Sequence, residues 1–148
     1  MSIKKKYIYF IEKPRSIGGP ASFQSRFEKK LSEHGYSILY SNNRFYSNFS
    51  TLFIIGGTKK IFWLIKNKLN GARIIQRLDG INDYAFHFKD GLFKFLKSRL
   101  MYFLMNFIRC VLADHVVYQS KYVKNLWKQF GGKLSLIHIS EPTRQLQI

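Results

Sequence analysis

Two short groups of residues have the types and spacing needed to hold a polar ligand. Gly18 and Gly19 precede a helical pattern, so backbone amides there could approach an anion or a sugar, and the helix dipole would add partial positive charge. Arg77, Asp79 and Gly80 follow an apolar run. Arg-x-Asp at that place supplies a bidentate donor and a carboxylate acceptor, a pair suited to the vicinal hydroxyls of a sugar.

Each of these signals also has a plainer interpretation. The glycine pair could form a simple turn, because its spacing matches neither the dinucleotide-binding fingerprint nor a P-loop. Arg77 and Asp79 could form an internal ion pair, and Asp79 with Gly80 could form a turn. Ser120 could contact a ligand or could only cap the following helix. The sequence shows no Ser/His/Asp triad, no paired catalytic carboxylates and no metal-ligand spacing, so we assign no catalytic residue, metal or cofactor.

The elements that must position these residues follow from hydrophobic periodicity. Apolar runs bounded by turn residues predict five strands, at residues 7–11, 36–41, 51–57, 72–80 and 114–120. Helical spacing predicts helices between them, at about residues 20–34, 59–70, 91–112 and 121–132. The core face of the third helix is expected to hold Phe93, Leu96, Leu100, Leu104, Phe107 and Val111.

This alternation of strands and helices predicts an α/β fold, a Rossmann-like, doubly wound parallel sheet. Thr58 is expected to be the N-cap of the second helix, and Gly35 to end the first helix in a left-handed conformation. In open parallel sheets, ligands bind beyond the carboxyl ends of the strands. Because the candidate residues all follow predicted strands, we expect them along one edge of the sheet.

The net charge limits the partners to be considered. The chain has 25 basic and 8 acidic residues and a formal net charge of +17. A field of that sign favours anionic partners, such as a membrane surface, phosphorylated lipids or sugars, or nucleic acid, although a solvated lysine-rich surface is the plain alternative. The aromatic residues fall mostly at core spacing and the basic residues are spread over all elements, so we expect no nucleic-acid partner.

The sequence contains no segment that reads as a secretion signal or as a membrane span. The apolar run after the basic start ends at Glu12, and the longest apolar region, around residues 100–108, falls short of the roughly 20 residues that a spanning helix needs. We therefore expect a cytoplasmic protein, peripheral on the inner membrane face.

Three segments resemble, in order and spacing, the N-terminal domain of family 4 glycosyltransferases. They are GGPASFQSRFEKKLSEHGYSI, RIIQRLDGIN and ADHVVYQSKYVKNLWKQFGG, within residues 6–132. Many members carry a His-centred motif after the fourth strand, where this chain has Arg77-Leu78-Asp79-Gly80, as a subset does. That departure leaves the acceptor-side chemistry open.

The resemblance implies a two-domain enzyme with a cleft between Rossmann-like halves. Such an enzyme transfers a sugar from a nucleotide-sugar donor to a glycan or lipid-linked acceptor, with retention and without a required metal. This chain would be the acceptor-side half, in the synthesis of a cell-surface polysaccharide or lipid-linked glycan. Its acceptor contacts would be Gly18, Gly19, Arg77, Asp79, Gly80 and Ser120. No residue here would bind the donor, since nothing in residues 1–133 matches the nucleotide-binding half with its paired glutamates.

The last residues of the chain differ from the rest. The segment LSLIHISEPTR, residues 134–144, resembles a translated sequencing adapter and contains neither Lys nor an aromatic residue. We therefore expect residues 1–133 to be a partial domain, residues 134–148 to be a non-native tail outside the fold, and the fragment alone to be inactive. The alternative function is a basic α/β domain that binds nucleic acid or a small anion without catalysis.

Overall fold

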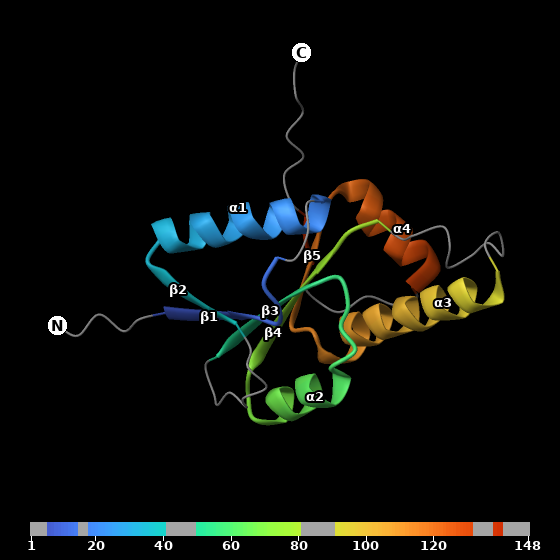
Figure 1. Ribbon diagram of the computed structural model, residues 1–148, viewed down its shortest axis with the longest axis horizontal. Coiled ribbons are helices and arrows are strands. Elements are labelled where there is room, and N and C mark those ends of the chain that lie inside the picture. The colour runs from blue at the N-terminus through green and yellow to red at the C-terminus, as the bar shows by residue number, and fades with distance from the viewer. Residues whose placement is uncertain (1–5, 15–17, 41–49, 81–90, 132–137, 141–148) are drawn as a thin grey trace, which may run out of the picture.

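A parallel sheet forms the centre of the molecule. The computed structural model describes residues 6–14, 18–40, 50–80, 91–131 and 138–140. Five strands lie in the order β2-β1-β3-β4-β5, and every neighbouring pair is parallel (Figure 1). Their bounds are β1 (Lys6–Phe10), β2 (Tyr36–Tyr40), β3 (Thr51–Ile55), β4 (Arg73–Leu78) and β5 (His115–Tyr118). The predicted Rossmann-like parallel α/β sheet is confirmed.

Among the described residues, four α-helices accompany the strands, in the chain order that the sequence predicts. They are α1 (Gly19–Glu33), α2 (Ile61–Leu69), α3 (Leu92–Phe107), which continues into a π-helical turn (Ile108–Leu112), and α4 (Lys121–Gly131). The prediction for Thr58 was wrong in detail. The N-cap of α2 is Lys60, and the Thr58 hydroxyl instead accepts a hydrogen bond of 3.2 Å from the Lys60 backbone N–H.

Helix α1 covers one face of the sheet through aromatic contacts. The Phe27 ring lies 4.9 Å from that of Phe53 on β3 and 6.3 Å from that of Phe10 on β1. Phe23, one turn earlier, stacks on Phe27 at 5.4 Å. These contacts set the helix across β1 and β3.

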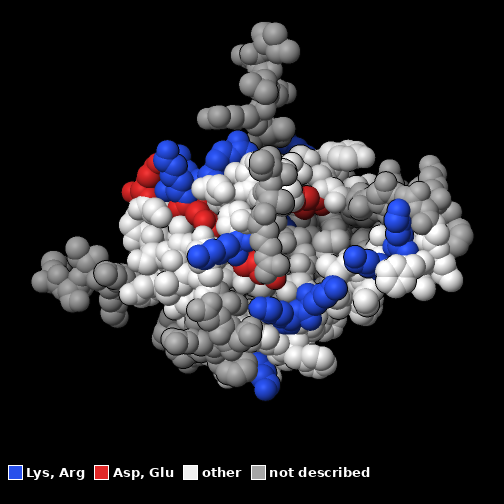
Figure 2. Space-filling model, viewed as in Figure 1, with Lys and Arg blue, Asp and Glu red and all other residues white. Residues whose placement is uncertain are grey.

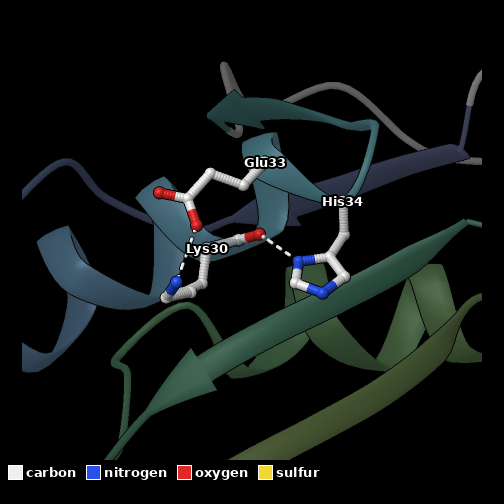
Figure 3. A network of polar contacts seen from close by, with 3 residues as sticks. All are labelled: Lys30, Glu33 and His34. Carbon is white, nitrogen blue, oxygen red and sulfur yellow. Dashed lines mark hydrogen bonds and ion pairs between the residues drawn. The ribbon is translucent and has the colours of Figure 1, made fainter.

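The C-terminal end of α1 is closed by polar contacts of its own residues (Figure 3). The His34 ring nitrogen Nδ1 lies 2.8 Å from the carbonyl of Lys30, whose ammonium contacts Glu33 at 2.8 Å. Gly35 follows with a φ of 79°, in the left-handed region predicted for it. The chain can therefore turn sharply from α1 into β2.

The other face of the sheet carries two apolar clusters. The first joins β3 and β4 to α2 and the π-helical turn, with Leu52, Ile74, Leu64 and Ile108 among its buried members. The second joins the ends of β4 and β5 to α4, and includes Leu78, Val116, Tyr118, Val123 and Trp127. Tyr102 and Met105 of α3 pack against this second cluster. The sheet is thus covered on both faces, as a buried parallel sheet requires.

The prediction of a core-facing stripe on α3 was wrong for most of its members. Phe93, Leu96, Leu100 and Val111 are all exposed, and α3 has no buried residue. Burial begins only in the π-helical turn, at Ile108. A π turn adds one residue to the helical repeat and so changes which side chains face the sheet. The sequence pattern revealed an apolar stripe but could not reveal whether anything covers it.

Residues His138–Ser140, within the segment that resembles an adapter, form a sixth short strand, β6, parallel to β5. Without β6, β5 would be the edge strand of the five-stranded sheet. The unpaired backbone groups of an edge strand accept an extended segment of almost any sequence. The pairing therefore does not test the origin of the tail, which stays a prediction.

Candidate functional site

The carboxyl ends of neighbouring strands are tied together by backbone hydrogen bonds. The N–H of Gly56, after β3, donates to the carbonyl of Arg77 at 2.8 Å. The N–H of Gln119, after β5, donates to the carbonyl of Leu78 at 3.1 Å. The guanidinium of Arg77 lies 3.7 Å from the ring centre of Phe23, in the first turns of α1. The segments that carry the candidate residues, 18–19, 77–80 and 120, thus belong to one edge of the sheet.

A cavity of about 500 Å³ opens at this edge, at the ends of β1 and β3. In the strand order 2-1-3-4-5, the connections leave β1 and β3 in opposite directions, and this switch point is where open α/β sheets bind ligands. The volume lies within the range of small-molecule sites. Its lining comprises Phe10, Ile11, Glu12, Lys13, Pro14, Pro20, Ala21, Gln24, Phe53, Ile54, Ile55, Gly57, Thr58, Lys59, Lys60 and Met101.

The polar part of the cavity wall is mainly basic. Lys13 comes from the loop after β1, and Lys59 and Lys60 come from the loop after β3. The Lys13 ammonium also lies 5.3 Å from the ring centre of Tyr40. Three lysines among the lining residues of one cavity favour a ligand that carries negative charge, and Glu12 adds an acceptor for hydroxyl groups.

A chain of hydrogen bonds fixes the wall formed by α1. The Gln24 amide donates to the carbonyl of Glu12 and to the carboxylate of Glu28, both at 2.8 Å. The Tyr40 hydroxyl donates to the same carboxylate at 2.7 Å. Burial and this hydrogen bond raise the pKa of Tyr40 to about 12, so its hydroxyl remains a donor at neutral pH. These hydrogen bonds therefore hold α1 to the loop after β1 and to β2, beside the cavity.

The glycine pair lies at the start of α1, next to the cavity wall formed by Pro20 and Ala21. Gly18 is the N-cap, with an extended φ of 172°, and no side chain caps the helix. Neither glycine lines the cavity itself. A Cβ atom added at Gly18 or Gly19 would meet no atom of the described residues within 4 Å, so these residues leave space for a ligand to approach the backbone there.

Arg77 and Asp79 interact with each other rather than with an open cleft. Their side chains form an ion pair, and only 4% of the Arg77 side chain is exposed, against 29% for Asp79. This is the internal ion pair that the sequence left open as the alternative. Neither residue lines the cavity, and Gly80 does not line it either. A binding role for these three residues stays a prediction.

Ser120 and the Asp79 backbone anchor α4 to this edge. The Ser120 hydroxyl accepts a hydrogen bond of 3.2 Å from the N–H of Val123, which is the geometry of a helix cap. The indole N–H of Trp127 donates to the carbonyl of Asp79 at 2.9 Å. A contact between Ser120 and a ligand stays a prediction, and its structural role is that of a cap.

The edge of the sheet was predictable from the sequence, but most of the polar cavity lining was not among the predicted residues. Lys13, Lys59 and Lys60 follow β1 and β3 directly, so the rule that selected Arg77 could have selected them too. Gln24 and Met101 carried no such signal, because their contribution depends on how α1 and α3 sit beside the strands. No group of three or more potential metal ligands occurs among the described residues.

A scan against models of protein families, a search of curated proteins and a search of solved structures each found no match to this chain. The structure establishes the Rossmann-like parallel sheet, and the resemblance to a glycosyltransferase family rests on the quoted segments. In the described part of the chain, no helix combines the length and apolar character needed to cross a membrane.

Proposed function

We propose that the chain is the acceptor-binding half of a family 4 glycosyltransferase. The parent enzyme transfers a sugar from a nucleotide-sugar donor to a glycan or lipid-linked acceptor, with retention and without a required metal. The observation that carries the proposal is the basic cavity at the ends of β1 and β3, beside the glycine-rich start of α1. The proposal is also supported by the three segments that resemble the family, since they contain the start of α1 and the residues that follow β4 and β5.

The chemistry of the cavity supports an acceptor that carries phosphate as well as hydroxyl groups. Lys13, Lys59 and Lys60 can neutralise a phosphate, and the uncapped amides at the start of α1 can donate to it. Glu12 and Thr58 can contact sugar hydroxyls. The donor nucleotide and the paired glutamates belong, in this proposal, to a second Rossmann-like half.

A second candidate is a domain that binds a small anion without catalysis. The same lysine-lined cavity favours it, since binding an anion requires no second half. The two candidates differ in whether a sugar is transferred when donor and acceptor are both supplied to the full-length protein.

The first test is the ligand preference of the 148-residue chain. We expect thermal shifts and NMR titrations to give binding of phosphorylated glycans, with resonance changes at residues 12–14, 18–24 and 57–60, and much weaker binding of nucleotide sugars. We also expect no turnover, because transfer needs donor and acceptor in one closed site. Sugar transfer by this chain alone would contradict the proposal.

Substitution of Gly18 by Ala separates ligand contact from folding. The added methyl group meets no atom of the described part of the chain, so we expect unchanged thermal stability. It would occupy the space through which a phosphate reaches the backbone, so we expect affinity to fall about tenfold or more, which corresponds to roughly 1.4 kcal/mol or more. Gly80→Ala is the matched control, because a Cβ atom there also meets no atom of the described residues. Neither glycine lines the cavity, but Gly18 is two residues from Pro20 of its wall, whereas no described lining residue comes from the segment directly after β4. Equal affinities for both variants would place the ligand elsewhere.

A further inference from the structure

Helix α3 presents an uncovered apolar stripe. Five large apolar side chains are between 55% and 82% exposed, and they are Leu92, Phe93, Leu96, Leu100 and Phe103. Their spacing of three and four residues places them on one side of the helix. Such a stripe is usually buried against a partner, since exposed apolar surface of this extent is uncommon in a monomer.

The opposite side of α3 is the side that contacts the fold. Tyr102 stacks on Trp127 of α4 with ring centres 5.3 Å apart. Met105 lies against Gly57 and accepts a hydrogen bond of 3.1 Å from the Gln76 amide at its carbonyl. Met101 lines the cavity. Figure 1 shows the first turns of α3 projecting away from the strands. By helical spacing, the exposed stripe lies on the side of α3 away from these contacts.

Basic side chains flank the stripe on both sides. At 100° per residue, Lys97 lies about 40° beyond Phe93 at one border, and Arg99 lies about 20° beyond Leu92 at the other. Both are exposed. The sequence has no Asp or Glu from Gly91 to Ala113. In Figure 2, the part of the surface where α3 lies shows basic side chains next to uncharged ones, without acidic side chains among them.

This charge pattern distinguishes between two occupants of the stripe. A second copy of the chain would bring Lys97 and Arg99 close to the same residues of its partner, with no acidic residue on α3 to compensate, and like charges in an interface oppose association. An anionic lipid surface complements the basic borders and accepts the apolar stripe in its acyl region. The net charge of +17 adds long-range attraction to such a surface.

We propose that α3 is an interfacial helix that binds the protein to an anionic membrane. The stripe lies about 5–10 Å deep at the boundary between headgroups and acyl chains, and Lys97 and Arg99 contact lipid phosphates. The inference goes beyond the proposed function and requires no sugar transfer. The inference also bears on the proposed function. Because Met101 lines the cavity, a docked α3 holds that cavity close to acceptors anchored in the membrane.

Co-sedimentation of the 148-residue chain with lipid vesicles tests the proposal. We expect binding to phosphatidylcholine vesicles that contain 30% phosphatidylglycerol, and at least tenfold weaker binding to phosphatidylcholine alone. Binding should weaken strongly between 20 mM and 500 mM salt, because the Debye length shortens. Lys97→Gln with Arg99→Gln should lower the partition coefficient about 25-fold, or about fivefold for each charge removed.

Variants of the stripe distinguish insertion of α3 into the membrane from non-specific adsorption of the protein to vesicles. Leu96→Ser with Phe103→Ser should lower binding at least tenfold while leaving thermal stability unchanged, since neither side chain is buried. The matched control is Phe62→Ser with Leu69→Ser on α2, whose side chains are 84% and 81% exposed, and it should bind as the parent does. A Phe103→Trp variant should show quenching of its added fluorescence by brominated lipids, and Phe62→Trp should not.

Several outcomes would overturn the proposal. They are equal binding to neutral and anionic vesicles, equal loss in the α2 and α3 variants, and self-association of the chain that the α3 variants abolish. The last would make the stripe an interface between two copies. If vesicles are not bound but the full-length protein transfers sugar to a soluble acceptor, the membrane proposal fails and the proposed function stands.

Discussion

Asp114 connects three elements through one carboxylate. It forms an ion pair with Lys68 of α2 and accepts a hydrogen bond of 2.8 Å from the N–H of Ile74 on β4, while the residue itself leads into β5. Burial alone would raise the pKa of the Asp114 carboxyl, but the two hydrogen bonds and the nearby positive charge hold that pKa below its ordinary value. The charged form of Asp114 therefore stabilises the fold.

Substitution of Asp114 by Asn should lower the free energy of unfolding at pH 7 by about 1–3 kcal/mol, the cost of breaking a partly buried charged hydrogen bond. Since the pKa of Asp114 is depressed in the folded state, its contribution is complete above the unfolded pKa of about 4 and is lost as pH falls through the lower folded value. Urea titrations at several pH values measure the difference between parent and variant, which should shrink below pH 4.

Glu33→Gln is the control for this prediction. Glu33 also forms an ion pair, with Lys30, but both side chains are largely exposed, and surface pairs contribute little. The charge of Asp114 would be ruled out as the cause in two cases. One is a loss of unfolding free energy in Asp114→Asn that stays constant from pH 7 to pH 2, and the other is an equal loss in Glu33→Gln.

At the scale of elements, one contact fixes how α3 meets the sheet. A Cβ atom at Gly57, directly after β3, would lie 2.5 Å from Cγ of Met105. The absence of a side chain at Gly57 thus allows α3 to approach the strand ends closely, where the Gln76 amide also joins the carbonyls of Gly56 and Met105. Gly57 thus serves packing between elements, and it also lines the cavity.

Gly57→Ala should destabilise the protein by about 1–3 kcal/mol, as overpacking of a close contact does. Gly57→Ala combined with Met105→Ala should recover part of that loss relative to Met105→Ala alone, because the obstructing side chain is gone. Thermal denaturation of the three variants gives the coupling. Full additivity of the two substitutions would show that the contact is not the source of the effect.

The elements themselves could largely be predicted from the sequence, because apolar runs and helical spacing are interrupted by Gly35, Gly71 and other turn residues at the right places. The orientation of α3 could not. Its stripe from Phe93 to Phe103 has the period of a buried helix, and only the position of α3 relative to β3 and α4 shows that this side is uncovered. Periodicity defines an apolar face but not its partner.

At the scale of the whole molecule, the candidate ligand-binding residues and the cavity lie at the carboxyl edge of the sheet. Sequence order was enough to place residues 18–19, 77–80 and 120 there, since parallel strands bring their ends together. The cavity was not predictable in the same way, because it depends on α1, the loop after β3 and Met101 meeting around the ends of β1 and β3.

Sugar transfer by the full-length protein tests the central claim most directly. We propose that a second, nucleotide-binding half follows Lys133, so a chain that contains both halves should be produced and transfer measured from a panel of radiolabelled nucleotide sugars to phosphorylated and lipid-linked glycans. We expect transfer with retained anomeric configuration in the presence of a metal chelator, and a raised KM for acceptor but not for donor in Lys59→Ala. A natural continuation without a second nucleotide-binding half, or a complete protein that binds the anion and transfers nothing, would contradict the account.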